Sequence, residues 1–253
     1  MIIDALSLKG KVAIVTGCDT GLGQGMALGL AQAGCQVVGV NYIEPTETIE
    51  KMNEAGHTFL DVRANLLKQD DIPRIIEETI AKFGKIDVLV NNAGIIRRED
   101  AVDFSEQNWD DVMNINSKTV FFMSQAVAKQ FMAQGHGGKI INIASMLSFQ
   151  GGIRVPSYTA SKSAVMGITR AMANEWAKHN INVNAIAPGY MATNNTEALR
   201  ADEARNAAIL ERIPADRWGT PEDVAGPCVF LASNAANYIN GYTIAVDGGW
   251  LAR

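Results

Sequence analysis

The chain has 253 residues, 47% of them hydrophobic and 19% charged, and a net charge of −5 at neutral pH. Its length suits one large globular domain or two small ones with a sizeable core. The acidic balance argues against nucleic acid as a partner, because a phosphate-binding face needs clustered Lys and Arg, and no apolar run reaches the ~18–20 residues of a membrane span.

Apolar runs of strand length alternate with helix-length segments along the whole chain. Continuous hydrophobicity, rather than alternation, is typical of parallel strands covered on both faces. The pattern predicts a doubly wound α/β fold without a linker or repeat, so we expect residues 1–253 to form a single domain. The seven expected strands are Lys11–Thr16, Gln36–Val40, Thr58–Val62, Ile86–Asn91, Lys139–Ala144, Ile181–Ala187 and Tyr242–Val246.

A glycine-rich turn, "TGCDTGLGQG", follows the first expected strand and opens a helical pattern from Leu22 to Ala33. A tight strand-to-helix turn would also explain glycines here. The context is the one that a dinucleotide site requires, however, and it gives each glycine a role. Gly17 would allow the turn, Gly21 would let the backbone approach a pyrophosphate, and Gly23 would let the helix pack closely on the sheet. Phosphates would then meet free N–H groups at the helix N-terminus.

Charge at the end of the second strand favours NAD over NADP. This end normally reads the adenosine ribose, and here it is "VNYIEP", with Asn41 and Glu44. The glycine loop adds Asp19 and Thr20, and neither segment has an Arg or Lys for a 2′-phosphate. We expect Asp19 and Glu44 to repel that phosphate and Asn41 to hydrogen-bond a free ribose hydroxyl.

Tyr158 and Lys162 lie four residues apart in "SYTASKSA". On a helix the two side chains share one face, with Cβ atoms about 5–6 Å apart. Taken alone, the pair could be incidental on a surface helix.

The ordered set of motifs resembles the short-chain dehydrogenase/reductase family. It comprises "TGxxxGxG" at 16–23, "NNAG" at 91–94, Asn116, Ser145, "YxxxK" at 158–162, "PG" at 188–189 and "VDGG" at 246–249. The resemblance covers nearly the whole length. It implies a single Rossmann-type domain with a seven-stranded parallel sheet and helices on both faces, and a homotetramer.

The same resemblance assigns the catalytic roles. Tyr158 would be the general acid/base at the substrate oxygen, and Lys162 would favour its phenolate and hold the nicotinamide ribose. Ser145 would hydrogen-bond the reacting oxygen, and Asn116 would anchor a proton-relaying water. The expected cofactor-binding residues are Gly17, Asp19, Thr20, Gly21, Leu22, Gly23, Asn41, Asn65, Leu66, Asn92, Ala93, Gly94, Tyr158, Lys162, Pro188, Gly189, Met191 and Thr193. Asn65 departs from the family, which usually has Asp beside the adenine.

Polar residues next to the expected pocket indicate an acidic substrate. Arg98 follows "NNAG", and Gln150 and Arg154 lie between Ser145 and Tyr158. An arginine fork matches a carboxylate, although a lone surface arginine is more often solvated or ion-paired. We expect Arg98, Ser145, Gln150, Arg154 and Tyr158 to bind substrate.

Longer stretches, including "NNAGIIRREDA" and "SMLSFQGGIRVPSYTASKS", resemble the family's dehydrogenases of deoxy sugar acids. The implied reaction interconverts 2-dehydro-3-deoxy-D-gluconate and 3-deoxy-D-glycero-2,5-hexodiulosonate with NAD⁺/NADH, with 2-deoxy-D-gluconate oxidised at C3 as a further activity, in pectin and uronate breakdown. Two alternatives remain open: a 3-oxoacyl thioester reductase of the same family, and a non-catalytic NAD-sensing scaffold.

Further expectations concern the tail, the compartment and a lid. Residues at about 190–215 would form a mobile substrate lid, as in the family. Trp250 and Leu251 at the chain end would be buried at a subunit interface. The widely spaced Cys18, Cys35 and Cys228 suit a reducing compartment, and Asp4 does not suit a signal peptide, so we expect a cytoplasmic protein. Neither the cysteines nor the three histidines have metal-ligand spacing, so no metal is expected.

Overall fold

Seven parallel strands form one sheet in the computed structural model, which describes residues 2–253. The spatial order is β3-β2-β1-β4-β5-β6-β7, and every neighbouring pair is parallel. The predicted seven-stranded parallel sheet is confirmed, and no strand end lies more than two residues from its predicted position. The strands are β1 Val12–Thr16, β2 Gln36–Asn41, β3 Phe59–Arg63, β4 Val88–Asn91, β5 Gly138–Ile143, β6 Ile181–Pro188 and β7 Thr243–Val246.

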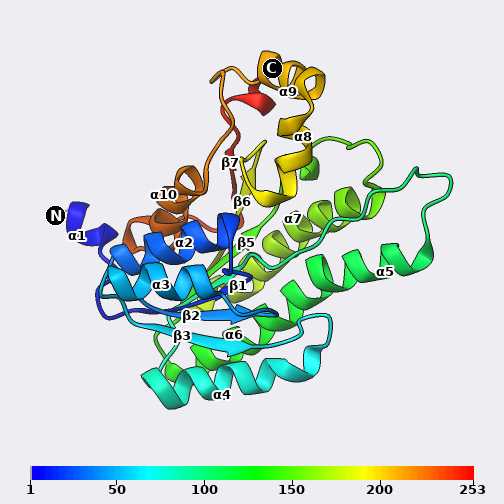
Figure 1. Cartoon of the computed structure of the whole chain (residues 1–253). Helices are drawn as coiled ribbons and strands as arrows, with labels where there is room; N and C mark the ends of the chain where they lie inside the picture. The colour runs from blue at the N-terminus through cyan, green and yellow to red at the C-terminus, as the bar shows by residue number, and fades with distance from the viewer. Residues whose placement is uncertain (1) are drawn as a thin grey trace.

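Helices cover both faces of the sheet (Figure 1). α2, α3 and α10 lie on one face, whereas α4, α6 and α7 lie on the other. The short helices α8 and α9 stand apart from these layers, beside the C-terminus. The α-helices are α1 Ile2–Leu6, α2 Gly21–Gln32, α3 Thr46–Glu54, α4 Ile72–Phe83, α5 Glu106–Met113, α6 Thr119–Gln134, α7 Pro156–Trp176, α8 Glu197–Ala201, α9 Glu203–Arg212 and α10 Pro221–Ala232.

The two helical layers explain why the strands lack polar alternation. Along β1, Ala13 and Val15 enter a core shared with α2 and α10, whereas Val12 and Ile14 enter a core shared with α4, α6 and α7. Successive strand residues point to opposite faces, so a strand buried on both sides must be apolar at every position.

A π-helical turn, Asn114–Lys118, joins α5 to α6. Such a turn holds an extra residue and occurs frequently at functional sites. It contains Asn116, which is fully buried. The sequence pattern gave no sign of this local widening.

The three cysteines are free and buried, and burial raises the pKa of Cys18 and Cys35 to about 12. Their thiols therefore stay protonated near neutral pH. Within residues 2–253, no helix has the length and apolar character to cross a membrane. No group of His, Cys, Asp or Glu in that range could hold a metal ion.

Candidate active site

The glycine loop is built from β1 and braced by the strand end beside it. Thr16 Oγ1 accepts hydrogen bonds from the backbone N–H groups of Asn92 (3.0 Å) and Ala93 (2.9 Å). Asn92 Nδ2 in turn donates to the Gly17 carbonyl oxygen at 2.7 Å. Gly17 has φ +63°, a left-handed conformation that favours glycine and turns the chain into the loop. The predicted turn at Gly17 is thus confirmed, and hydrogen bonds from Asn92 and Ala93 hold it in place.

Two further glycines shape the start of α2. A Cβ at Gly23 would overlap the Gly17 carbonyl oxygen and lie 2.5 Å from Asn92 Nδ2, so only glycine lets α2 begin this close to the loop. Gly21 has φ +58°, and a Cβ there would meet only Thr193, 3.6 Å away. The Thr20 side chain does not cap the helix, although Ser105 caps α5 and Asp202 caps α9. The first N–H groups of α2 therefore remain available to an outside acceptor, as a bound pyrophosphate requires.

Asn41 lies beneath this loop. Its Oδ1 accepts from the Cys18 backbone N–H at 2.9 Å, and its Nδ2 donates to Asp61 Oδ1 at 2.9 Å. The side chain is only 1% exposed. This geometry does not support the expected ribose contact by the Asn41 side chain. Its observed role is to fasten β2 to the loop.

A basic residue lies near the same end of β2 although it is distant in sequence. Arg63 ends β3 and pairs with Asn41 in the sheet register. Its Nη2 donates to the Tyr42 carbonyl oxygen at 2.9 Å, and its Nε lies 4.0 Å from Asp61 Oδ2. The glycine loop and the end of β2 contain no Arg or Lys of their own. The neighbouring strand β3 supplies Arg63, so the local sequence does not reveal it.

Asn65 and Leu66 follow β3. Asn65 Oδ1 accepts from the Leu67 backbone N–H at 3.1 Å, so its side chain closes a local turn. Leu66 is buried in the core beside α4, and its carbonyl accepts from Thr119 Oγ1 at 2.6 Å. The Asn65 side chain and the Leu66 carbonyl therefore already have hydrogen-bond partners within the chain, and both bonds fix the local backbone.

Tyr158, Lys162 and Ser145 meet where β5 ends and α7 begins. Lys162 Nζ lies 5.6 Å from the centre of the Tyr158 ring and donates to the Ile143 carbonyl at 2.6 Å. Ser145 hydrogen-bonds the Tyr158 side chain. The helical spacing read from the sequence thus places phenol and ammonium on one face of α7.

Ser148 holds this group together, and the sequence analysis did not single it out. Its hydroxyl donates to the Lys162 carbonyl at 2.6 Å and accepts from the Ser145 backbone N–H at 3.3 Å. Ser145 and Ser148 form a capping box around the short 3₁₀ turn Met146–Ser148. The turn fixes Ser145 relative to α7.

Burial dominates the protonation of both catalytic groups. It raises the pKa of Tyr158, and the Ser145 hydrogen bond and the charge of Arg98 oppose that effect. Burial lowers the pKa of Lys162 to about 8. A low-dielectric site disfavours the charged form of each group. The charge of Arg98 favours the Tyr158 phenolate, and the Lys162 ammonium lies 5.6 Å from the centre of the Tyr158 ring.

Asn116 is fixed in the π turn by both of its side-chain atoms. Oδ1 accepts from the Ile95 backbone N–H at 2.9 Å, while Nδ2 donates to the Ile95 carbonyl at 2.9 Å and to Ser161 Oγ at 3.1 Å. A Cβ at Gly94 would lie 2.9 Å from Asn116 Oδ1. The expected catalytic Asn therefore connects the "NNAG" turn to α7, one turn from Tyr158.

The expected substrate-binding residues separate in the structure. Arg98 acts electrostatically on Tyr158, and its Nη2 donates to the Asn195 carbonyl at 3.5 Å. Arg154 is exposed and forms an ion pair with Asp100 at 2.8 Å. Asp100 lies only two residues after Arg98 in the sequence, but in the structure it pairs with Arg154. Arg98 is therefore the better placed of the two to meet a substrate carboxylate.

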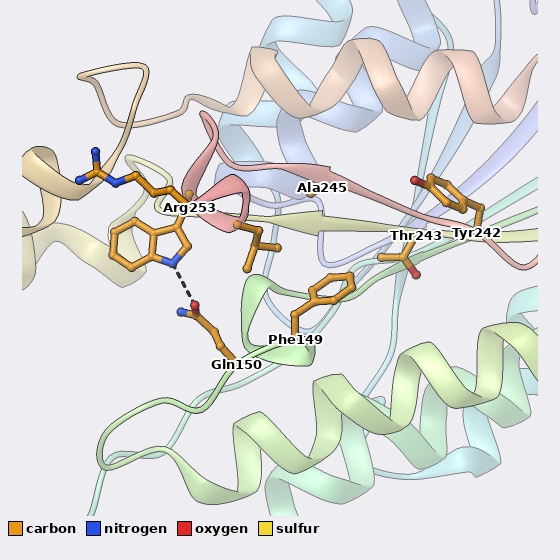
Figure 2. A pocket seen from close by; sticks show the side chains of 8 residues that line it. Phe149, Gln150, Tyr242, Thr243, Ala245 and Arg253 are labelled. Atoms are coloured by element: carbon orange, nitrogen blue, oxygen red, sulfur yellow. Dashed lines mark hydrogen bonds between the residues drawn. The ribbon is translucent and has the colours of Figure 1, made fainter.

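Gln150 lies against the C-terminal tail. Its Oε1 accepts from Trp250 Nε1 at 3.2 Å, drawn as a dashed line in Figure 2, and from Arg212 Nη2 at 3.5 Å. The Arg212 guanidinium stacks 4.0 Å above the Trp250 ring, and Tyr190 packs edge-on against it. Gln150 thus supports the tail through its side-chain oxygen.

The tail docks on its own chain. Trp250 is 4% exposed and packs with Met146, Ile209 and Ile213. Arg253 Nη2 donates to the Glu211 carbonyl at 2.8 Å, so the chain end meets α9. Within one chain α9 and Gln150 already cover the Trp250 ring, whereas Leu251 is half-buried; the expected subunit interface at the tail stays a prediction.

A cavity of about 510 Å³ lies beside the tail, which lines it through Trp250, Leu251 and Arg253 (Figure 2). Its lining includes Phe149, Gln150, Tyr242 and Arg253, and excludes Ser145, Tyr158 and Lys162. It is thus separate from the catalytic group.

The end of β6 and the segment after it contain four predicted cofactor residues. Gly189 donates to the Val246 carbonyl at 2.9 Å, and a Cβ at Gly189 would lie 2.7 Å from the Asp247 Cα. Pro188 ends β6, Met191 is buried, and Thr193 faces Gly21. Of these four predicted cofactor residues, Thr193 is the one that lies against the glycine loop, at Gly21. Residues 190–215 contain α8 and α9.

Comparison with known proteins agrees with this geometry. A family model described as enoyl-(acyl carrier protein) reductase matches residues 17–251. The chain belongs to the short-chain dehydrogenase/reductase family. The protein is an oxidoreductase acting on a CH–OH group, in keeping with the dehydrogenases to which it is similar.

Three similar members of the short-chain dehydrogenase/reductase family have named activities. The 2-dehydro-3-deoxy-D-gluconate 5-dehydrogenase of Escherichia coli (strain K12) is 74% identical over 253 residues, which cover all of both chains. A solved structure from Agrobacterium tumefaciens, assigned as a 2-deoxy-D-gluconate 3-dehydrogenase with bound NADP, is 55% identical, with TM-score 0.91 over 99% of this chain and 100% of that one. The gluconate 5-dehydrogenase of Burkholderia cenocepacia, in complex with NADP and tartrate, is 36% identical, with TM-score 0.95 over all of both chains.

Proposed function

We propose that this protein interconverts 2-dehydro-3-deoxy-D-gluconate and 3-deoxy-D-glycero-2,5-hexodiulosonate, using NAD⁺/NADH, in the breakdown of pectin and uronates. It would also oxidise 2-deoxy-D-gluconate at C3. The observation that carries the proposal is the placement of Arg98, a carboxylate-binding type of residue, close enough to Tyr158 to affect its pKa. The 74% identical relative from E. coli bears the same activity in its name.

The chain's own residues supply the proton chemistry. In the oxidative direction, Tyr158 takes the proton of the substrate hydroxyl, and Ser145 hydrogen-bonds the same oxygen as it becomes a carbonyl. A bound nicotinamide would supply the hydride acceptor. Lys162 binds the nicotinamide ribose and passes the proton from Tyr158 toward solvent. Asn116 supports this relay from the π turn, where the backbone departs from regular α-helical bonding.

Substrate turnover tests the proposal directly. Purified protein mixed with NAD⁺ and 2-dehydro-3-deoxy-D-gluconate should generate NADH absorbance. A preference for 3-oxoacyl thioesters with NADPH would instead identify a thioester reductase. Dinucleotide binding without turnover of either substrate would support the non-catalytic scaffold.

Arg98 should discriminate acidic from neutral substrates. Arg98→Leu removes a charge-assisted pair to the carboxylate, worth about 2–4 kcal/mol where water is excluded. We expect kcat/KM for the sugar acid to fall about 30-fold to 1000-fold, and that for its lactone far less. Arg154→Leu is the matched control, because its charge is already paired with Asp100. Equal losses on acid and lactone would mean that Arg98 only shapes its loop.

NAD is the proposed cofactor, and the cofactor site supports it through charge. Asp19 and Glu44 disfavour a 2′-phosphate, and the guanidinium of Arg63 lies beside the Asp61 carboxylate. Three structural neighbours hold NADP, so the ratio of kcat/KM for NAD⁺ and NADP⁺ decides the question. The proposal requires a ratio well above one. Arg63→Gln should raise the ratio further if Arg63 is what admits NADP⁺.

The segment 190–215 is proposed as a lid over the dinucleotide and substrate. Most of α9 is exposed, with Ile209 as its buried residue, so little apolar surface holds the helix down. Such segments open at low free-energy cost. Hydrogen exchange in α8 and α9 should therefore slow when NADH and the sugar acid are added. High and equal protection with and without ligands would contradict the lid.

We further propose a cytoplasmic homotetramer in which residues 1–253 act as one domain. The free buried thiols support a reducing compartment. Phe149 and Tyr242, 49% and 63% exposed, lie beside the edge strand β7, where apolar surface favours association. Sedimentation at micromolar concentration should return four copies, and a monomer would refute the assembly.

A further inference from the structure

Arg200, in α8, has a charge without a carboxylate partner. Its Nη2 donates to the Thr193 carbonyl at 3.1 Å. Its Nε is buried and has no hydrogen-bond partner. Among residues 2–253, no Asp or Glu forms an ion pair with it, although Glu197 and Glu203 each lie three positions away in sequence. A buried donor without an acceptor is costly.

The position of Arg200 points to an anionic acceptor. Thr193, which receives its Nη2, faces Gly21: a Cβ at Gly21 would lie 3.6 Å from Thr193 Cγ2. Gly21 begins α2, whose first N–H groups lack a side-chain cap. Thr193 therefore links the guanidinium to the residue at which α2 begins.

We propose that Arg200 binds the pyrophosphate of the dinucleotide and so fastens the lid over it, an inference that rests on the proposed dinucleotide site. Nε and an Nη of one guanidinium form a fork that fits two phosphate oxygens. The α2 N-terminus would bind the pyrophosphate from one side and Arg200 from the other. Arg98, which reaches Asn195 in the same segment, remains for the substrate carboxylate.

The test measures binding without any sugar acid. ADP-ribose carries the pyrophosphate, whereas AMP has only one phosphate. Calorimetric titration should show Arg200→Gln binding ADP-ribose about 10-fold to 100-fold more weakly than wild type, with AMP affinity changed less than about 3-fold. Arg200→Lys should recover part of the loss. Arg205→Gln is the matched control, because Arg205 is an exposed arginine of the neighbouring helix α9.

Hydrogen exchange gives a second readout, with NADH as the only ligand. NADH should slow exchange in α8 and α9 of the wild type and of Arg205→Gln, but not of Arg200→Gln. Unchanged ADP-ribose affinity in Arg200→Gln would overturn the proposal, and a raised KM for the sugar acid in that variant would reassign Arg200 to the carboxylate. If wild type itself fails to bind ADP-ribose, the dinucleotide site is wrong and this role falls with it.

Discussion

Tyr158→Phe is expected to lower kcat/KM for the sugar acid by about 10²–10⁴-fold, the range that a positioned general acid/base contributes. The substitution deletes one hydroxyl and keeps the ring that packs beside Lys162. Burial opposes the phenolate, while Ser145 and Arg98 favour it, so the hydroxyl is the atom that this environment controls. Steady-state kinetics in both directions measure the loss.

Dinucleotide binding provides the control for Tyr158→Phe. The dissociation constant of NADH should change little, because the hydroxyl acts on the substrate oxygen. A variant that retains more than a small fraction of wild-type turnover would exclude Tyr158 as the acid/base. A large loss of NADH affinity would mean that the residue mainly supports the cofactor site.

Lys162→Met should strongly decrease turnover and weaken NADH binding. It should also change the free energy of unfolding by an amount that depends on pH. Burial holds the pKa of Lys162 at about 8, below its ordinary 10.5, so the folded protein binds this proton less tightly than the unfolded chain. That difference corresponds to a cost of about 3 kcal/mol, which is full below pH 8 and disappears as the pH rises toward 10.5. Loss of the hydrogen bond to the Ile143 carbonyl lowers the free energy of unfolding of the variant by about 1 kcal/mol and so offsets part of this effect.

Urea unfolding at pH 7 and pH 10 separates these effects. Without dinucleotide, Lys162→Met should be the more stable protein at pH 7, by about 2 kcal/mol, and should lose that advantage by pH 10. Lys178→Met, at an exposed position just beyond α7, is the matched control and should show no such dependence. A difference in the free energy of unfolding that is equal at both pH values would show that burial does not destabilise the charged form of Lys162.

Local signals in the sequence predicted the fold well. Each expected strand was found within two residues, because a strand buried on both faces must be apolar throughout and turn residues bound it. The spacing of Tyr158 and Lys162 also transferred directly, since α-helical geometry alone places residues four apart on one face. Gly17 and Gly23 were predictable for a similar reason, because each backbone position excludes a Cβ.

Pairings between distant residues could not be predicted in this way. Asp100 could have paired with Arg98 or Arg154, and only the folded loops decide for Arg154. The sequence position of Asn41 is that of a ribose-binding residue, but in the structure its side chain hydrogen-bonds Cys18 and Asp61 instead. Arg63 lies in β3 and Arg200 in α8, and no local sequence motif marks either residue. A buried polar group chooses its partner in three dimensions, so the substrate and cofactor contacts were the least predictable part of the site.

The docking of the C-terminal tail has a practical consequence for handling the protein. Trp250 is enclosed by Tyr190, Arg212 and Gln150, and Arg253 already touches α9. A purification tag fused after Arg253 would therefore emerge against α9, the helix proposed to move during turnover. A tag preceding α1 would emerge far from α9 (Figure 1). Kinetic measurements are best made on protein tagged at the N-terminus or freed of its tag.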